Sequence, residues 1–163
     1  MPTVRTNDVD TYYEQRGDGP AVVFVHGALA DHTAATGQLE AFSDDYTAIA
    51  YDGRGHGRTA NPGNPPYTID QLADDLRAFL EALDLDRPVV CGVSMGGMIA
   101  QRYACQYPER LGGLVLADTF TPPYVSLRDR IERGLVISGV RLGIRLVGYE
   151  RAKGALLWFG RKL

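Results

Sequence analysis

A serine flanked by small residues follows an apolar run in the stretch VVCGVSMGGM, residues 89–98. Its Gly92-Val93-Ser94-Met95-Gly96 matches the G-x-S-x-G pattern, in which a sharp strand-to-helix turn exposes a nucleophilic serine hydroxyl. The pattern alone is common. Here it lies between a β-branched segment and an amphipathic segment, which is the context that the motif requires. Ser94 is therefore the candidate nucleophile.

Backbone N–H groups beside Ser94 could stabilise the negative charge that develops when a serine attacks a carbonyl. The segment after Ser94 is a predicted helix, and a helix N-terminus presents oriented N–H groups and a partial positive charge. The N–H of Met95 is the expected first donor. The stretch His26-Gly27-Ala28 follows an earlier apolar run and offers a second donor, at Ala28 or alternatively at Leu29.

A serine nucleophile requires a general base, which is most often a histidine. The three histidines, His26, His32 and His56, all precede Ser94. We interpret His26 as a buried residue that braces its loop, His32 as a surface or loop residue, and His56 as a support for the Gly-rich loop GRGHGRT. His56 as the base is the less favoured alternative. None of the three is accompanied in the sequence by other possible metal ligands, so no metal site is predicted.

Short apolar runs alternate with amphipathic segments through the first 120 residues. A hairpin is expected from residues 3–6 and 10–16, with its turn at Asn7-Asp8. Further strands are expected at AVVFVHG, YTAIAYD, RPVVCGVS and LGGLVLADT, and helices at residues 33–42, 69–83 and 95–107. Thr68 and Gln71 fit a capping box at the start of the second helix. This alternation predicts an α/β fold with a doubly wound, mostly parallel sheet.

The 163 residues fit one domain with a real core, but the charge is divided unevenly along them. Residues 1–120 carry 8 basic and 17 acidic side chains, and residues 121–163 carry 9 and 3. We interpret the basic segment as a lid over an acidic body rather than a tail that binds membrane or nucleic acid.

Cys91 and Cys105 are too few for a disulfide framework and are expected to be small buried hydrophobes. Without a signal core or an 18-residue apolar run, a soluble cytoplasmic protein is expected.

The motifs VVFVHGALAD, TAIAYDGRGHGRT and the stretch from YTIDQLADDL through CGVSMGGM to LVLADT occur in a specific order and spacing over about residues 3–120. Together they resemble the α/β-hydrolase fold family, in the branch that contains enol-lactonases, non-haem haloperoxidase-like esterases and carbon–carbon bond hydrolases. The resemblance implies Ser94 as nucleophile and the Met95 and Ala28 backbone amides as the oxyanion hole. A serine at the elbow argues against the haloalkane dehalogenases and epoxide hydrolases of the same fold.

The family orders its triad as Ser, then Asp or Glu, then His, and no histidine follows Ser94. Asp118 matches the position where some members place the acid, although a polar residue that closes a strand is the more common role. We expect residues 1–120 to form the hydrolase core with its first six strands, incomplete at its C-terminal edge. Residues 121–163 are expected to begin a helical lid. The strand at 114–117 would then be an unpaired apolar edge.

The expected function is hydrolysis of an ester, lactone or related acyl bond in a small-molecule substrate through a Ser94 acyl-enzyme. No cofactor is expected, nor is nucleic acid or membrane as a partner. The chain alone is expected to be inactive or very weak, because nothing deprotonates Ser94. Two alternatives remain. One is a non-catalytic α/β-hydrolase-like protein that pairs with itself or another chain through the exposed edge, and the other is one half of a split hydrolase.

Overall fold

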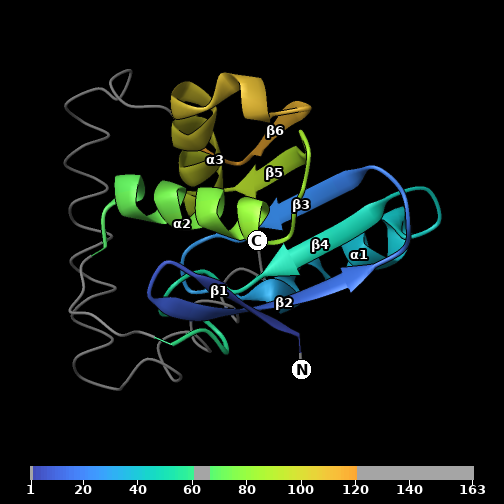
Figure 1. Ribbon diagram of the computed structural model, residues 1–163, viewed down its shortest axis with the longest axis horizontal. Coiled ribbons are helices and arrows are strands. Elements are labelled where there is room, and N and C mark those ends of the chain that lie inside the picture. The colour runs from blue at the N-terminus through green and yellow to red at the C-terminus, as the bar shows by residue number, and fades with distance from the viewer. Residues whose placement is uncertain (1, 61–66, 121–163) are drawn as a thin grey trace, which may run out of the picture. The chain divides into compact units, whose positions relative to one another are not determined.

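A computed structural model describes residues 2–60 and 67–120, which form a sheet with helices on both faces (Figure 1). The strands are β1 (Thr3–Thr6), β2 (Val9–Arg16), β3 (Ala21–Val25), β4 (Thr47–Tyr51), β5 (Val89–Val93) and β6 (Gly113–Ala117). Their order within these residues is β1-β2-β4-β3-β5-β6. The β1–β2 and β2–β4 pairs are antiparallel, and β4, β3, β5 and β6 run parallel. The predicted doubly wound, mostly parallel sheet is confirmed.

Helical segments connect the parallel strands. They are η1 (His32–Ala35), α1 (Thr36–Phe42), α2 (Ile69–Ala82), α3 (Met95–Gln106) and η2 (Pro108–Arg110). The helix expected at residues 33–42 thus begins as a 3-10 turn. Helix α2 begins where the sequence predicts, because Thr68 Oγ1 accepts a hydrogen bond from the N–H of Gln71 at 3.1 Å.

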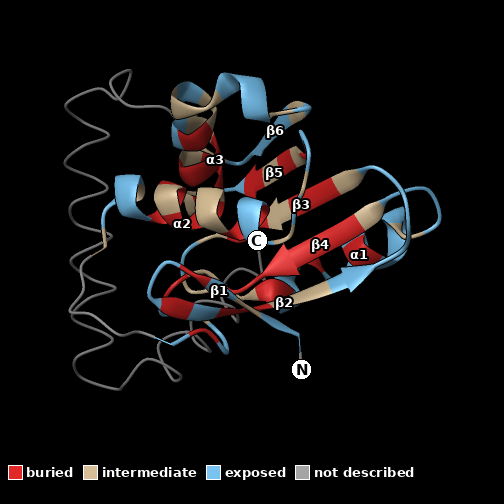
Figure 2. Ribbon diagram, viewed as in Figure 1, coloured by how far each residue is buried: buried red, intermediate tan, exposed pale blue. Residues whose placement is uncertain are grey.

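The two faces of the sheet are covered by different helices, and the alternation of side chains along β4 shows how. Ile49 and Tyr51 belong to the larger core with α2 and α3, whereas Ala48 and Ala50 pack with Leu39 of α1. Phe79 of α2 is fully buried and its ring stacks on Tyr51 with centroids 4.5 Å apart. Figure 2 shows this burial concentrated in the central strands and the inner faces of α2 and α3.

Two expectations about individual side chains need correction. Cys105 is exposed and not a buried hydrophobe, because it lies on the outer side of α3, away from the buried Ile99 and Tyr103. Cys91 is only half-buried, although the burial that it has raises the pKa of its thiol. The predicted exposure of β6 is confirmed, since Leu114, Val115 and Leu116 are 38–50% exposed.

The expected lid at residues 121–163 lies outside the described residues, and its assignment stays a prediction. Within the described residues, none of the helices combines the length and the apolar character that crossing a bilayer requires.

Helix α3 approaches the end of β3 so closely that only glycine fits at its second position. A Cβ added to Gly96 would lie 2.1 Å from the carbonyl oxygen of Val25 and 2.6 Å from that of His26. Neither of those backbone atoms can move without shifting β3 or the loop that follows it. Gly37 in α1 is a matched glycine with open space, since a Cβ there would have no neighbour within 4 Å.

We predict that Gly96→Ala lowers the free energy of unfolding by about 1–3 kcal/mol, because the added methyl forces backbone apart in a packed region. Gly37→Ala should instead raise it by about 0.5–1 kcal/mol, because alanine loses less conformational entropy in a helix. Urea denaturation followed by circular dichroism measures both variants. Equal effects of the two substitutions would contradict the close approach of α3 to β3.

Candidate active site

Ser94 forms the turn between β5 and α3 in a conformation that side chains rarely adopt. Its φ and ψ are 53° and −115°, and such a conformation costs on the order of 1–3 kcal/mol unless the surroundings hold it. The Ser94 N–H donates to the Ala117 carbonyl at 3.0 Å, and the Ser94 carbonyl accepts from Thr119 Oγ1 at 2.7 Å and from the Gly97 N–H at 3.0 Å. The end of β6 and the first turn of α3 therefore fix this residue.

The loop after β3 lies directly beside the serine. A Cβ built on Gly27 would be 3.4 Å from Ser94 Cβ and 4.0 Å from Ser94 Oγ. The loop then turns back, with the Ala30 N–H donating to the Gly27 carbonyl at 3.3 Å and Leu29 at a φ of 63°. Because β3 and β5 are parallel neighbours, their carboxyl ends bring these two loops to the same edge of the sheet.

Two backbone donors at this edge are available to a ligand. Within residues 2–60 and 67–120, neither the Ala28 N–H nor the Met95 N–H donates to a protein acceptor. Ala28 is exposed, and Met95 is the first residue of α3, a helix of 12 residues. Its N–H groups therefore carry the partial positive charge of a helix N-terminus. Such donors suit an oxyanion on a carbon bonded to Ser94 Oγ.

His26 braces the loop after β3, as the sequence predicts. Its Nε2 accepts the N–H of Gly53 at 3.0 Å, so the ring hydrogen is on Nδ1, which donates to the Gly27 carbonyl at 2.8 Å. Burial lowers the pKa of His26 and so favours the neutral ring that this arrangement needs. With both nitrogens engaged, His26 holds backbone and is not positioned to deprotonate Ser94.

His56 lies in the loop after β4 and is half-buried. Its Nδ1 donates to the Arg54 carbonyl at 3.0 Å, and its ring centroid is 5.0 Å from that of His26. This is the backbone-holding role predicted for it. All three histidines of the chain are among the described residues, and none of them hydrogen-bonds to Ser94.

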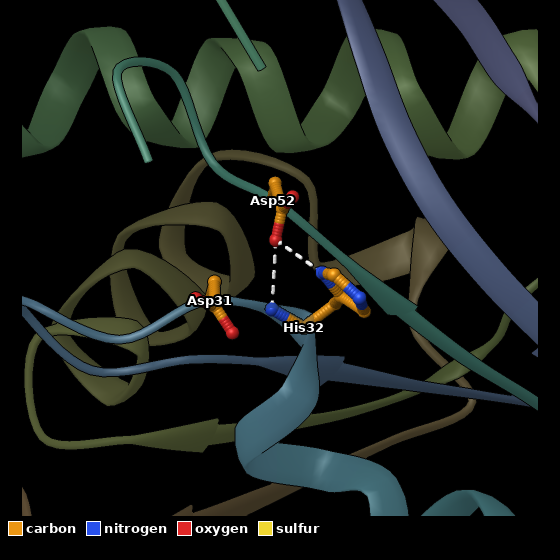
Figure 3. A group of neighbouring side chains, drawn as sticks. All are labelled: Asp31, His32 and Asp52. Atoms are coloured by element: carbon orange, nitrogen blue, oxygen red, sulfur yellow. Dashed lines mark hydrogen bonds and ion pairs between the residues drawn. The ribbon is translucent and has the colours of Figure 1, made fainter. Parts of the chain in front are cut away.

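The interpretation of His32 as a surface or loop residue is wrong. It is 5% exposed, and both its backbone N–H and its Nδ1 contact Asp52 Oδ1, at 2.7 and 2.8 Å. Its Nε2 lies 3.3 Å from Glu14 Oε1. The expectation that no other possible metal ligand lies near the histidines is also wrong. His32 lies with Asp31 and Asp52 in one group whose possible ligand atoms are all within 4.8 Å of one another (Figure 3). Sequence separation hides this group, since Asp52 comes from the end of β4.

Asp52 connects the two loops beside the site and was missed as a site residue by sequence reasoning. It is fully buried, and while Oδ1 contacts His32, Oδ2 accepts the Arg58 N–H at 2.7 Å. The signal that could have identified it is an acidic residue at the end of a buried strand, directly before the Gly-rich stretch GRGHG.

Arg54 fixes the far side of the same Gly-rich loop. Its guanidinium is 3% exposed and binds Asp75 of α2 at 2.7 Å and Asp8 of the β1–β2 turn at 2.6 Å. The guanidinium lowers the pKa of the Asp8 carboxyl. Arg54 therefore ties the loop to α2 and to the hairpin and has a structural role.

Asp118, the candidate acid, lies at the same edge as Ser94. It is exposed, has a φ of 46°, and stands between Ala117 and Thr119, both of which hydrogen-bond to the backbone of Ser94. Its backbone therefore lies next to the elbow, at the end of β6. None of the three histidines, all of which are described, hydrogen-bonds to Asp118.

Comparison with known proteins matches residues 20–157 to the family model described as alpha/beta hydrolase fold. The chain is 37% identical over 119 residues to 3-oxoadipate enol-lactonase 2 of Acinetobacter baylyi, covering 72% of this chain and 44% of that protein. It is 38% identical over 138 residues to non-heme chloroperoxidase CPO-A1 of Kitasatospora aureofaciens, covering 83% and 50%. Among solved structures, a thermophilic esterase from Thermogutta terrifontis matches with a TM-score of 0.74 and 31% identity, covering 90% and 54%.

The chain thus spans about half the length of the curated relatives that it matches. The matched segment of the family model covers most of the chain and includes β3 to β6 with the elbow at Ser94. Two of the three similar enzymes carry names of the lactonase and esterase kind that the sequence motifs suggest. The chain belongs to the α/β-hydrolase fold family.

Proposed function

We propose that this chain carries the nucleophile and the oxyanion hole of a serine hydrolase that cleaves an ester, lactone or related acyl bond. The observation that carries the proposal is the position of Ser94, on a strained strand-to-helix turn beside two N–H groups that have no acceptor among residues 2–60 and 67–120. The lactonase and esterase names of similar proteins support an acyl substrate. A serine at the elbow, where the epoxide hydrolases and haloalkane dehalogenases of this fold use aspartate, supports acyl transfer as well.

In the proposed reaction, Ser94 Oγ attacks the substrate carbonyl carbon and its proton passes to a base. The carbonyl oxygen becomes an oxyanion that accepts hydrogen bonds from the N–H groups of Met95 and Ala28. Collapse of this intermediate expels the alcohol, which takes up the proton, and leaves an acyl group on Ser94. Water then hydrolyses the acyl-enzyme, releases the acid and restores the serine. These steps use protein groups and water, so the proposal invokes no cofactor.

The base is the part of this mechanism that the chain's three histidines do not supply. His26 and His32 have both ring nitrogens engaged or facing carboxylates, and His56 supports the Arg54 carbonyl. In the family order the histidine follows the acid, and Asp118 is the candidate for that acid. We propose that a histidine outside these 163 residues completes the site. A cytoplasmic location remains a prediction.

We predict that the chain alone hydrolyses p-nitrophenyl acetate several orders of magnitude more slowly than a complete serine hydrolase, because loss of a triad base costs this much even where the oxyanion hole is intact. Free imidazole should act as a substitute base and speed acetylation of Ser94, detected as an acetyl adduct by mass spectrometry of the intact chain and its peptides. Ser94→Ala should give no adduct at this site, and Met95→Leu, which keeps the backbone N–H, should behave as the wild type.

Failure of Ser94 to acetylate in the presence of imidazole would contradict its role as nucleophile. Robust turnover without imidazole that Ser94→Ala abolishes would instead show that a residue of this chain acts as the base. His56→Gln would then be the deciding variant.

A second candidate function, association through the sheet edge, is favoured by the exposure of β6. Val115 and Leu116 are 50% and 42% exposed, although they lie in a parallel strand of the type usually covered on both faces. In the described residues β6 pairs only with β5, so its outer edge presents unpaired backbone groups. A binding protein, or one half of a split hydrolase, would pair here with a second copy or with a complementing chain.

We predict that the wild-type chain sediments with a mass that rises with concentration, because apolar strand edges associate. The double variant Val115→Lys and Leu116→Lys should sediment as a monomer over the same range. Tyr46→Lys, at an apolar position of 38% exposure away from β6, is the matched control and should associate as the wild type does. A wild-type chain that is monomeric at all concentrations would exclude self-association through β6.

A further inference from the structure

The strongest group of side chains outside the proposed reaction is the one formed by Asp31, His32 and Asp52 (Figure 3). His32 and Asp52 are 5% and 0% exposed, and Asp31 is half-buried. We propose that this group is a binding site for a divalent metal ion of the zinc type, with one carboxylate oxygen from each aspartate and Nδ1 of His32 as protein ligands. The proposal does not depend on the hydrolase function.

The ligand atoms are already close to the spacing that one ion requires. His32 Nδ1 and Asp52 Oδ1 are 2.8 Å apart, and all three ligand atoms lie within 4.8 Å of one another. Zinc holds imidazole nitrogen and carboxylate oxygen at about 2.0–2.2 Å, so neighbouring ligands around the tetrahedral ion are about 3.4 Å apart. A small shift of Asp31, whose Oδ1 also caps η1, closes the remaining gap, and water can complete the coordination.

The orientation of His32 is the second feature that points to a metal. Its Nε2 lies 3.3 Å from Glu14 Oε1, and Glu14 in turn accepts a hydrogen bond from the Tyr12 hydroxyl at 3.1 Å. A metal-binding histidine usually donates its other ring N–H to a carboxylate, which fixes the tautomer and the ring orientation. The Glu14 carboxylate faces Nε2 in a similar way, and Nδ1 is directed at Asp52, in the position for coordination.

Charge gives a further reason for a cation here. The carboxylates of Asp31, Asp52 and Glu14 all lie around the His32 imidazole, so a cation held here is attracted by three nearby acidic groups. Without a metal, Nδ1–H donates to Asp52. When the ion binds, the Nδ1–metal bond replaces the Nδ1–H bond, and the neutral ring carries its hydrogen on Nε2, which faces Glu14. The mixed nitrogen and oxygen ligands favour zinc over magnesium or calcium, which prefer oxygen alone.

Such an ion would fasten the loop between β3 and η1 to the end of β4. Asp31 caps η1 through Oδ1, which accepts the Thr33 N–H at 3.0 Å, and Asp52 Oδ2 holds the Arg58 N–H. The proposed role of the ion is structural, because it would hold in place the loop that begins at His26 and Gly27. We expect the ion to raise the free energy of unfolding by RT ln(1 + c/Kd), where c is the concentration of free zinc.

The test is titration of chelator-treated chain with zinc chloride by isothermal calorimetry. We expect one zinc per chain, with His32→Gln and Asp31→Asn each weakening binding at least tenfold. Glu14→Gln should weaken it ten- to a hundredfold by loss of the carboxylate behind the histidine. His56→Gln, which changes a histidine outside the group, should bind zinc as the wild type does.

Circular dichroism establishes that each variant is folded, and if His32→Gln is not, Asp31→Asn decides the question because its side chain is half-buried. The absence of saturable one-to-one binding would overturn the proposal. Equal affinities of the wild type and of the folded ligand variants would overturn it too, since the zinc would then bind elsewhere on the surface. Neither result would affect the acetylation of Ser94, which tests the hydrolase proposal separately.

Discussion

The chain turns from β5 into α3 through one residue, Ser94, whose φ of 53° and ψ of −115° are unfavourable for any side chain. The conformation persists because hydrogen bonds from both sides hold the Ser94 backbone, one to Ala117 and one from Thr119. The turn directs the serine to the edge where β3 also ends, and the closeness of Gly27 follows from the pairing of β3 with β5. The remaining features of the candidate site depend on this turn.

A second set of contacts keeps the neighbouring loops in place. His26 accepts from Gly53, and Asp52 binds both His32 and the Arg58 backbone, so the loops after β3 and β4 hold each other. These links use buried polar side chains, which are stable only when their hydrogen bonds are satisfied. The two histidines therefore serve the scaffold. Because His26 and His32 hold these loops in place, neither of them provides the base, although both are close in sequence to the predicted oxyanion loop.

The sequence predicts the strands, the cap of α2 and the elbow because each depends on local signals. The pattern of apolar residues and the turn residues between them locate β1 to β6. Thr68 caps α2, as the spacing of Thr68 and Gln71 indicates. The approach of the Gly27 loop to Ser94 follows from a topology of parallel strands. The environment of His32 could not be predicted, because its partners Asp52 and Glu14 lie on other elements and meet it only after folding. The exposure of Cys105 was missed because residue type was given more weight than position on the helix.

The central claim, that Ser94 occupies a strained left-handed turn imposed by the fold, is tested most directly by the stability of two substitutions at this residue. Both Ser94→Ala and Ser94→Gly remove the hydroxyl, but only glycine relieves the strain. We predict that the free energy of unfolding of Ser94→Gly exceeds that of Ser94→Ala by about 1 kcal/mol in urea denaturation, despite the greater entropy that glycine loses on folding. A Ser94→Gly variant less stable than Ser94→Ala would contradict the account.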